Sequence, residues 1–174
     1  MITLYLLRHA KASQSSVDGR DESRPLNNRG RGASEAIGRY MREAAWRPSL
    51  VLCSTAKRSR ETLALLAGAA GWETDDPVVQ YSDRLYLAAP EETISQLQEL
   101  DGSVASVLVV GHNPGFHDIS LMLADPESMD YARLLENFPT GALAVLRDDS
   151  KSWRSLGTSK MELLRFLVPR ELVF

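Results

Sequence analysis

Residues 1–10 read MITLYLLRHA, and this stretch decides how the rest of the chain is interpreted. The run Ile2–Leu7 is almost wholly apolar and has the length of one strand, which predicts a strand buried on both faces of a sheet. It stops at Arg8 and His9. A cation and an imidazole directly after a buried strand either form an ordinary polar turn or belong to a functional site, and the other strand ends decide between the two.

The composition is that of a soluble globular protein. The chain has 174 residues, of which 44% are hydrophobic and 25% charged, so we expect a single domain over residues 1–174. A net charge of -3 argues against a nucleic-acid partner. No segment approaches the ~20 apolar residues of a membrane-spanning helix, and the first apolar run is too short for a signal peptide. We expect a cytoplasmic monomer with no membrane partner.

Cys53 is the only cysteine, and the chain has three histidines. An intramolecular disulfide is therefore excluded, and neither a thiolate zinc site nor another metal-ligand cluster is visible. The pairing of His112 with His117 lacks a credible third ligand. The glycine-rich phosphate-binding motifs of nucleotide-binding proteins are also missing. We expect no metal and no cofactor.

Strands and helices are predicted to alternate along the chain. Strands are expected at 2–7, 49–53, 78–81 and 106–110, and helices at 28–45, 56–70, 90–100 and 114–123. Residues 141–146 and 153–157 suggest a hairpin around Asp148-Asp149-Ser150, and 160–166 a short helix. This alternation predicts an α/β fold, a three-layer αβα sandwich with a mostly parallel central sheet. Such sheets bind ligands at the carboxyl ends of their strands.

Polar side chains follow three of these strands. The first strand ends at Arg8 and His9, the second leads through Ser54 into a helix that carries Arg58, and the strand 106–110 is followed by His112. Each side chain alone is more often a turn residue or a surface ion-pair partner than a functional group. Together, at one edge of one sheet, they predict a shared site.

The residue types at this edge suit phosphate chemistry. Two arginine forks match a tetrahedral oxyanion and neutralise most of the charge of about -1.5 to -2 on a phosphate group. Asn113 and Pro114 are predicted to be the cap and first residue of a helix, whose free N–H groups would add positive potential. A neutral imidazole can attack phosphorus, and nearby cations keep it neutral by lowering its pKa. The chemistry needs no metal.

The same motifs resemble those of the histidine phosphatase superfamily, in which an Arg-His pair opens the domain. The residues that carry this resemblance are Arg8-His9, Ser54 with Arg58 and Thr62, and Gly111-His112-Asn113-Pro114. The stretch 21–30, DESRPLNNRG, is more selective, because it resembles the D-x-x-R-P-L-x-x-R-G segment of the SixA-type phosphohistidine phosphatases. Residues 139–141 and 166–172 resemble this type as well, so the likeness covers nearly the whole chain.

The resemblance implies a phosphoglycerate-mutase-like fold and a role for each matching residue. His9 would be the nucleophile, Arg8 and Arg58 would hold the phosphoryl oxygens, and His112 would donate a further hydrogen bond to them. Substrate binding would involve Arg24 from a loop, Ser54 as an orienting hydroxyl, and Asn113. The partner would be a phosphorylated protein or a small phosphorylated molecule. Ala10 and Thr55 depart from the common Gly and Pro of the superfamily.

The general acid of the superfamily has no clear equivalent. Branches that act on phosphate esters place a Glu near the third strand, and residues 82–87 contain no matching motif; the available carboxylates are Asp83, Glu91, Glu92 and Asp118. An alkoxide leaves poorly without a proton, whereas phosphohistidine can expel neutral imidazole. The gap therefore favours phosphohistidine in a protein as substrate. The alternatives are a phosphomonoesterase for sugar or nucleotide phosphates and a non-catalytic phosphate-binding module.

Overall fold

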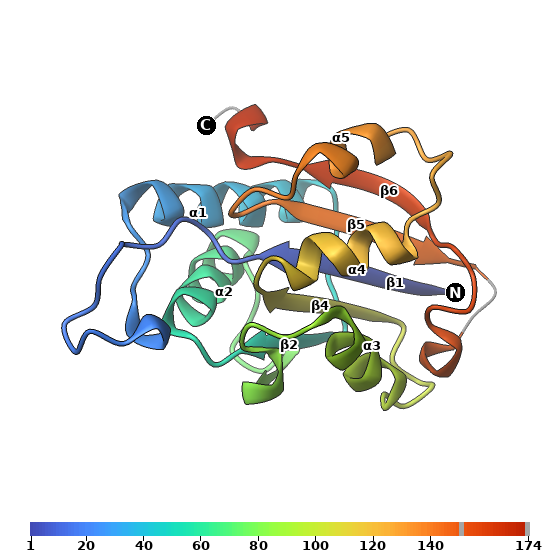
Figure 1. Cartoon of the computed structure of the whole chain (residues 1–174), viewed down its shortest axis with the longest axis horizontal. Helices are drawn as coiled ribbons and strands as arrows, with labels where there is room; N and C mark the ends of the chain where they lie inside the picture. The colour runs from blue at the N-terminus through green and yellow to red at the C-terminus, as the bar shows by residue number, and fades with distance from the viewer. Residues whose placement is uncertain (150–151, 173–174) are drawn as a thin grey trace.

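A computed structural model of the protein describes residues 1–149 and 152–172. Its centre is a six-stranded sheet in the order β3-β2-β4-β1-β5-β6 (Figure 1). The strands are β1 Ile2–Arg8, β2 Leu50–Ser54, β3 Val78–Ser82, β4 Ser106–Gly111, β5 Leu143–Asp148 and β6 Glu162–Leu167. The first four in chain order run parallel, and β5 and β6 are antiparallel to their neighbours. The mostly parallel sheet is confirmed.

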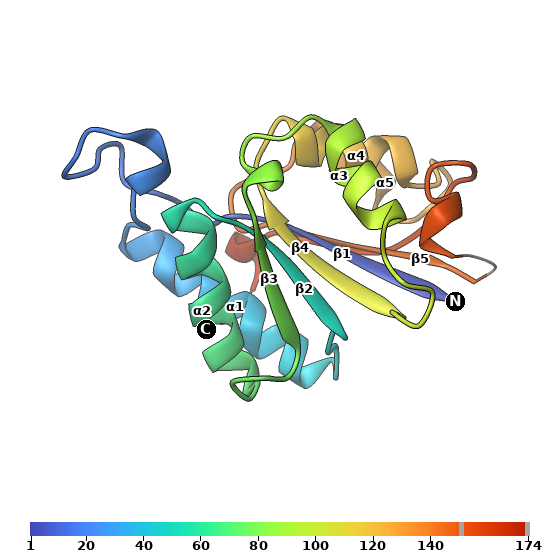
Figure 2. The ribbon, with the colours of Figure 1, turned by 90° about the horizontal axis from the view of Figure 1, so that it is seen from below.

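Helices cover both faces of this sheet, which confirms the three-layer αβα sandwich. The helices are α1 Asn28–Glu43, α2 Lys57–Ala70, α3 Pro90–Gln98, α4 Gly115–Leu123 and α5 Tyr131–Glu136. Figure 2 shows α1 and α2 on one side of the sheet and α3, α4 and α5 on the other. Within the described residues, three short 3-10 helices lie between these elements and a fourth follows β6: η1 Asp21–Ser23, η2 Asp83–Leu85, η3 Trp153–Ser155 and η4 Pro169–Glu171. None of the helices described is both long and apolar enough to span a membrane.

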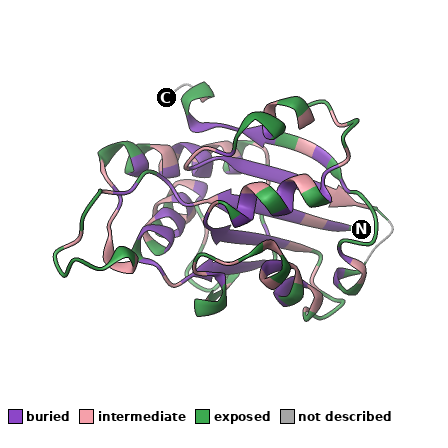
Figure 3. Ribbon diagram, viewed as in Figure 1, coloured by how far each residue is buried: buried purple, intermediate pink, exposed green. Residues whose placement is uncertain are grey.

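The strand β1 lies between β4 and β5, and its side chains supply both halves of the core. Leu4 and Leu6 pack in the cluster beneath α3 and α4, whereas Tyr5 and Leu7 pack in the cluster beneath α1 and α2. Figure 3 shows how completely the middle of the sheet is buried. Each such aliphatic side chain contributes about 1.5–3 kcal/mol by leaving water. The core therefore fixes β1 and, with it, the residues at its end.

The carboxyl-terminal part of the chain differs from the sequence expectation. Residues 153–157 are not a strand: Trp153 lies in η3, where its indole N–H donates to the Val104 carbonyl at 2.6 Å. Besides β1, the strand that pairs with β5 is β6, in the segment predicted to be a short helix. A short apolar run is compatible with either a helix or a strand. Here the backbone groups on the free edge of β5 bind those of residues 162–167, so the segment is a strand. Ser150 of the predicted turn lies outside the described residues, and α5 was not predicted.

Candidate active site

The carboxyl ends of β1, β2 and β4 meet at one edge of the sheet (Figure 1). The amide of His9, just after β1, donates to the Gly111 carbonyl at the end of β4 at 3.0 Å. This bond continues the parallel ladder by one residue. It brings His9 beside His112, with the two ring centroids 5.2 Å apart.

A cavity of about 300 Å³ opens at this edge. The predicted site residues that line it are Arg8, His9, Arg24, Arg58, His112 and Asn113. The other lining residues, to which the sequence analysis assigned no role in the site, are Lys11, Ala12, Asp21, Leu87 and Thr140. Ser54 does not line the cavity and instead lies behind one imidazole. The structure thus brings together residues from far apart along the chain.

The ring of His9 is held in one tautomer. Its Nδ1 lies 2.8 Å from the Ala10 carbonyl oxygen, and because a carbonyl only accepts, Nδ1 carries the proton. Burial, together with the charges of Arg58 and Arg8, lowers the pKa of His9 to about 4 although the Ala10 bond opposes the shift. At neutral pH the ring is uncharged, and the lone pair of its Nε2 accepts a hydrogen bond from Nε of Arg58 at 3.3 Å.

The ring of His112 is oriented from behind by Ser54. The Ser54 hydroxyl lies 2.7 Å from Nε2, and both side chains are buried. Burial, followed by the neighbouring His9 and Arg58, lowers the pKa of His112 to about 3. Its Nδ1 lies 3.4 Å from Nη2 of Arg58. A second neutral imidazole therefore stands beside the first.

Arg58 contacts His9, His112 and Asp21 and so lies at the centre of the site. It lies in the first turn of α2 and is only 2% exposed. Thr62, one turn later, connects the helix to the end of β1: its hydroxyl donates to the Arg58 carbonyl at 2.6 Å and accepts from the Ala10 amide at 3.0 Å. The backbone that presents Arg58 is thus tied to the backbone that presents His9.

Asp21 is the site residue that sequence reasoning missed. Its carboxylate accepts from Arg58 Nη2 and from Arg24 Nε, each at 3.0 Å, and from the Tyr86 hydroxyl. Mainly because of the Tyr86 bond and the contact with Arg58, the pKa of Asp21 is lowered to about 2. Its place at the start of the DESRPLNNRG stretch was the available signal, but no pattern indicated that it would reach α2.

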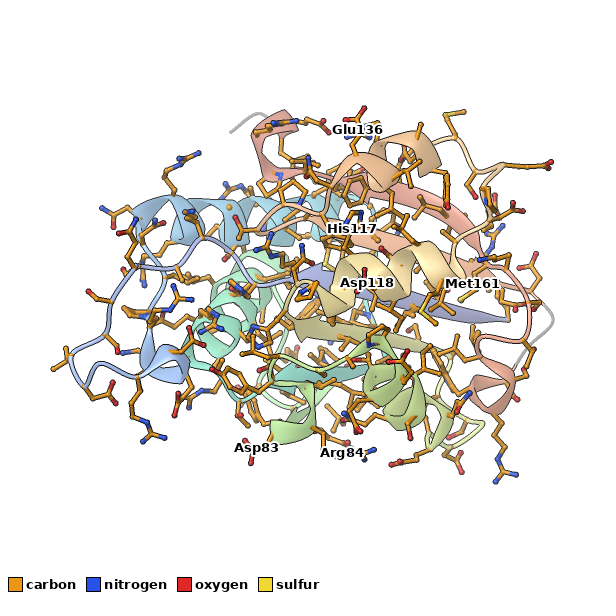
Figure 4. The ribbon with its side chains drawn as sticks, viewed as in Figure 1. Asp83, Arg84, His117, Asp118, Glu136 and Met161 are labelled. Atoms are coloured by element: carbon orange, nitrogen blue, oxygen red, sulfur yellow. The ribbon has the colours of Figure 1, made fainter. Side chains whose placement is uncertain are left out.

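The carboxylates considered from the sequence lie elsewhere. Asp83 in η2 accepts a hydrogen bond from the Thr55 hydroxyl at 2.6 Å, and Asp118 projects from α4 (Figure 4). Glu92 pairs with Arg84. Among the described residues 1–149 and 152–172, the lining of the cavity includes none of the four carboxylates considered from the sequence: Asp83, Glu91, Glu92 and Asp118. Asp21 is the only carboxylate that the described residues place there.

The described residues contain no cluster of three or more histidine, cysteine or acidic side chains that could hold a metal. The ring of His117, on α4, is engaged by the Leu134 carbonyl, which lies 2.8 Å from Nε2 (Figure 4). Its pairing with His112 as metal ligands therefore gains no support from the geometry.

The start of α4 differs by one residue from the prediction. The helix begins at Gly115 with Pro114 at the cap position, so Asn113 is not its cap. The Asn113 side chain is nevertheless used: its oxygen accepts from the His117 amide at 3.2 Å, and its nitrogen donates to the Phe138 carbonyl at 2.9 Å. These two bonds tie the start of α4 to the segment between α5 and β5, so the Asn113 side chain is engaged although it does not cap the helix.

The charges of the cavity suit a dianion. Arg8, Lys11, Arg24 and Arg58 contribute cations, against the single carboxylate of Asp21. The Nε of Arg8 is buried and has no hydrogen-bond partner in the described parts of the chain, although Nη1 donates to the Phe138 carbonyl. A buried donor without a partner is costly.

Comparison with known proteins agrees with this geometry. Residues 4–85 match the model of the histidine phosphatase superfamily (branch 1). An uncharacterized protein of Mycobacterium tuberculosis is 36% identical over 168 residues, which are 94% of this chain and 100% of that protein. The SixA protein of Nakamurella multipartitia, assigned as a phosphohistidine phosphatase, is 33% identical, with a TM-score of 0.82 over 97% of this chain and 96% of that one.

A second SixA protein, from Agrobacterium tumefaciens, is 34% identical, with a TM-score of 0.77 over 97% of this chain and 98% of its own. Both solved structures share the sheet, its covering helices and nearly the full length of the chain. The protein belongs to the histidine phosphatase superfamily and is of the SixA type.

Proposed function

We propose that the protein removes phosphate from phosphohistidine in another protein, with His9 as a covalent carrier of the phosphoryl group. The observation that carries this proposal is the state of His9: its Nδ1 proton is held by the Ala10 carbonyl and its pKa is about 4. At neutral pH Nε2 is therefore unprotonated; its lone pair accepts a hydrogen bond of 3.3 Å from Arg58, and His9 lines a cavity rich in cations.

The reaction has two displacements at phosphorus. In the first, Nε2 of His9 attacks, a new N–P bond forms, and the bond to the substrate imidazole breaks with its electron pair on the leaving nitrogen. In the second, water attacks the phosphorus of phosphorylated His9, the Nε2–P bond breaks with its electron pair on Nε2, and inorganic phosphate leaves while a water proton is released to solvent. Arg8, Arg58 and His112 would stabilise the equatorial oxygens in both steps.

The state of Asp21 favours phosphohistidine over phosphate esters. An alkoxide needs a proton from a well-placed acid as it leaves. The only carboxylate placed in the cavity by the described residues has a pKa of about 2 and is ionised at neutral pH. Phosphohistidine protonated on its second ring nitrogen leaves as neutral imidazole, so it needs no such donor. The assignment of the similar Nakamurella protein supports the same substrate.

The test is phosphate release from a phosphohistidine protein, measured beside phosphoramidate and a panel of sugar and nucleotide monophosphates. Replacing His9→Ala should lower turnover by ~10⁴–10⁶, as for other lost nucleophiles. His117→Gln is the matched control, because His117 lies outside the cavity, and it should retain the wild-type rate. Equal turnover by the wild type and H9A would disprove the nucleophile. A preference for an ester would instead identify a phosphomonoesterase, and tight phosphate binding without turnover a binding module.

A further inference from the structure

Leu87 is the unusual side chain in the wall of the cavity. It is 54% exposed although it is a large aliphatic residue. The other apolar lining residue among those described, Ala12, is only 8% exposed. The remaining lining side chains are charged or polar. Leu87 is therefore the one large apolar side chain that the described residues place in the lining of the cavity.

The backbone of Leu87 is also strained. Its φ is 49°, in the left-handed region that branched side chains rarely adopt. The chain is anchored on both sides of it. Leu85 is buried in the core, and the Ala88 carbonyl packs so closely on Gly115 that a Cβ there would lie 2.1 Å from its oxygen. Between these anchors the chain has to turn sharply at Leu87.

Neither the turn nor the core explains a leucine at this position. Glycine and asparagine adopt the left-handed conformation at lower cost, and the exposed side chain of Leu87 adds little to the core. Strain of this kind persists where a side chain is needed for function. The preceding residue supports this, because the Tyr86 ring packs edge-on against His112, with centroids 5.4 Å apart, while its hydroxyl binds Asp21.

We propose that Leu87 is a specificity-determining residue that contacts the leaving group. This inference rests on the proposed function and deepens it. The cationic side chains of the cavity would bind the phosphoryl oxygens. The leaving nitrogen departs on the side of the phosphorus opposite His9. In a phosphohistidine protein that nitrogen belongs to an aromatic ring with apolar faces, attached to a polypeptide. Leu87 packs on this ring and its neighbouring side chains; ammonia, the leaving group of phosphoramidate, is too small for such a contact.

The test compares kcat/KM for a phosphohistidine protein and for phosphoramidate in Leu87→Asn and Leu87→Gly. Both replacements relieve the backbone, so the Tm should rise. Phosphohistidine hydrolysis should fall about threefold to tenfold, as expected for about half of a leucine side chain no longer being buried. Phosphoramidate hydrolysis should not change. Leu87→Met, which keeps an apolar contact, should stay near the wild-type ratio of the two rates.

The chain offers a matched control for strain alone. Ala45, after α1, has a φ of 55° and lies outside the cavity. Ala45→Gly should raise the Tm and leave both rates unchanged. A wild type that hydrolyses neither substrate overturns the proposed function and this inference with it. Turnover of both substrates by the wild type, with the Leu87 variants losing both rates equally or neither, overturns only the role of Leu87.

Discussion

Asp21 holds Arg58 through two separate acceptors: its backbone carbonyl takes Nη1 at 2.8 Å, and its carboxylate takes Nη2 at 3.0 Å. The same guanidinium also reaches the lone pair of His9 through Nε. Arg58 is therefore aligned before any substrate arrives, but its donors already face an anion of the protein. An incoming phosphoryl group has to share them with Asp21.

Neutralising Asp21 should therefore strengthen the binding of inorganic phosphate. In Asp21→Asn the carboxylate no longer competes for Arg58 or repels the dianion, and we expect the Kd of phosphate to fall about threefold to tenfold. Calorimetric titration measures this. Asp18→Asn is the control, because Asp18 bonds within its own loop, to Ser16 and Ser23, and should leave the Kd unchanged. Weaker binding by D21N would contradict the competition.

The two buried imidazoles should remain neutral in mildly acidic solution. With pKa values of about 4 for His9 and about 3 for His112, both rings should be uncharged at pH 6, where an ordinary histidine of pKa 6.5 is mostly protonated. Nitrogen-15 NMR of the imidazoles between pH 4 and 8 tests this. It should also show the proton of His9 on Nδ1. Titration of either ring near pH 6.5 would be the opposite result.

The same shifts make stability depend on pH. Between pH 6.5 and about 4 the unfolded chain binds protons at His9 and His112 that the folded protein does not. Their contribution is fully present above pH 6.5 and is lost as the pH falls towards 4. Urea unfolding at pH 7 and pH 5 should show a lower free energy of unfolding at pH 5. In the double variant H9Q/H112Q this difference should shrink, and an undiminished difference would assign it to other groups.

Removing the Ser54 hydroxyl should loosen the His112 ring and lower the stability of the protein. Ser54→Ala leaves the buried Nε2 of His112 without its partner at 2.7 Å, which should lower the free energy of unfolding by about 1–3 kcal/mol. The loosened ring should lower kcat more than it raises KM. Ser59 offers a control: it is equally buried, and its hydroxyl has no hydrogen-bond partner among the described residues. S59A should be neutral, and equal losses in both variants would argue against a specific role for Ser54.

A close backbone approach should make Gly30 intolerant of a side chain. A Cβ at Gly30 would lie 2.1 Å from the Lys11 carbonyl oxygen, whereas one at Gly32, in the same helix, would meet no atom within 4 Å. Gly30→Ala should therefore destabilise the protein by about 1–3 kcal/mol. Gly32→Ala should stabilise it by up to about 1 kcal/mol through helix propensity. Chemical denaturation measures both changes, and a similar effect of the two would contradict the packing.

Much of the fold could be predicted because its signals are local and strong. The apolar runs that became β1 and β4 are too short for helices and too continuous for exposed strands. Gly71 ends α2 in the left-handed conformation, which is typical of glycine at the end of a helix. The end of the chain could not be read in the same way, because β6 is a strand only through its pairing with β5. The single domain, the monomeric state and the cytoplasmic location stay predictions.

Most residues of the site could be predicted from the order of strands and helices, whereas Asp21 could not. Arg8, His9 and His112 could be grouped because parallel strands bring their carboxyl ends to one edge. Asp21 reaches the site from a loop, and loops carry no periodicity from which a direction could be inferred. Asn113 was expected as a helix cap, but the Phe138 carbonyl, distant in sequence, also binds its side chain. Contacts of this kind depend on tertiary structure alone.

The position of β1 between two hydrogen-bonded neighbours has a consequence for dynamics. Its amides are shared with β4 on one side and β5 on the other, so they open to solvent only when the whole sheet comes apart. Deuterium should therefore enter this strand last. His9 extends the same ladder by its bond to Gly111. His9, the proposed nucleophile, is thereby anchored to the strand that should exchange most slowly, and we expect movements that widen the cavity to come from the segments that carry Asp21 and Leu87 in its wall.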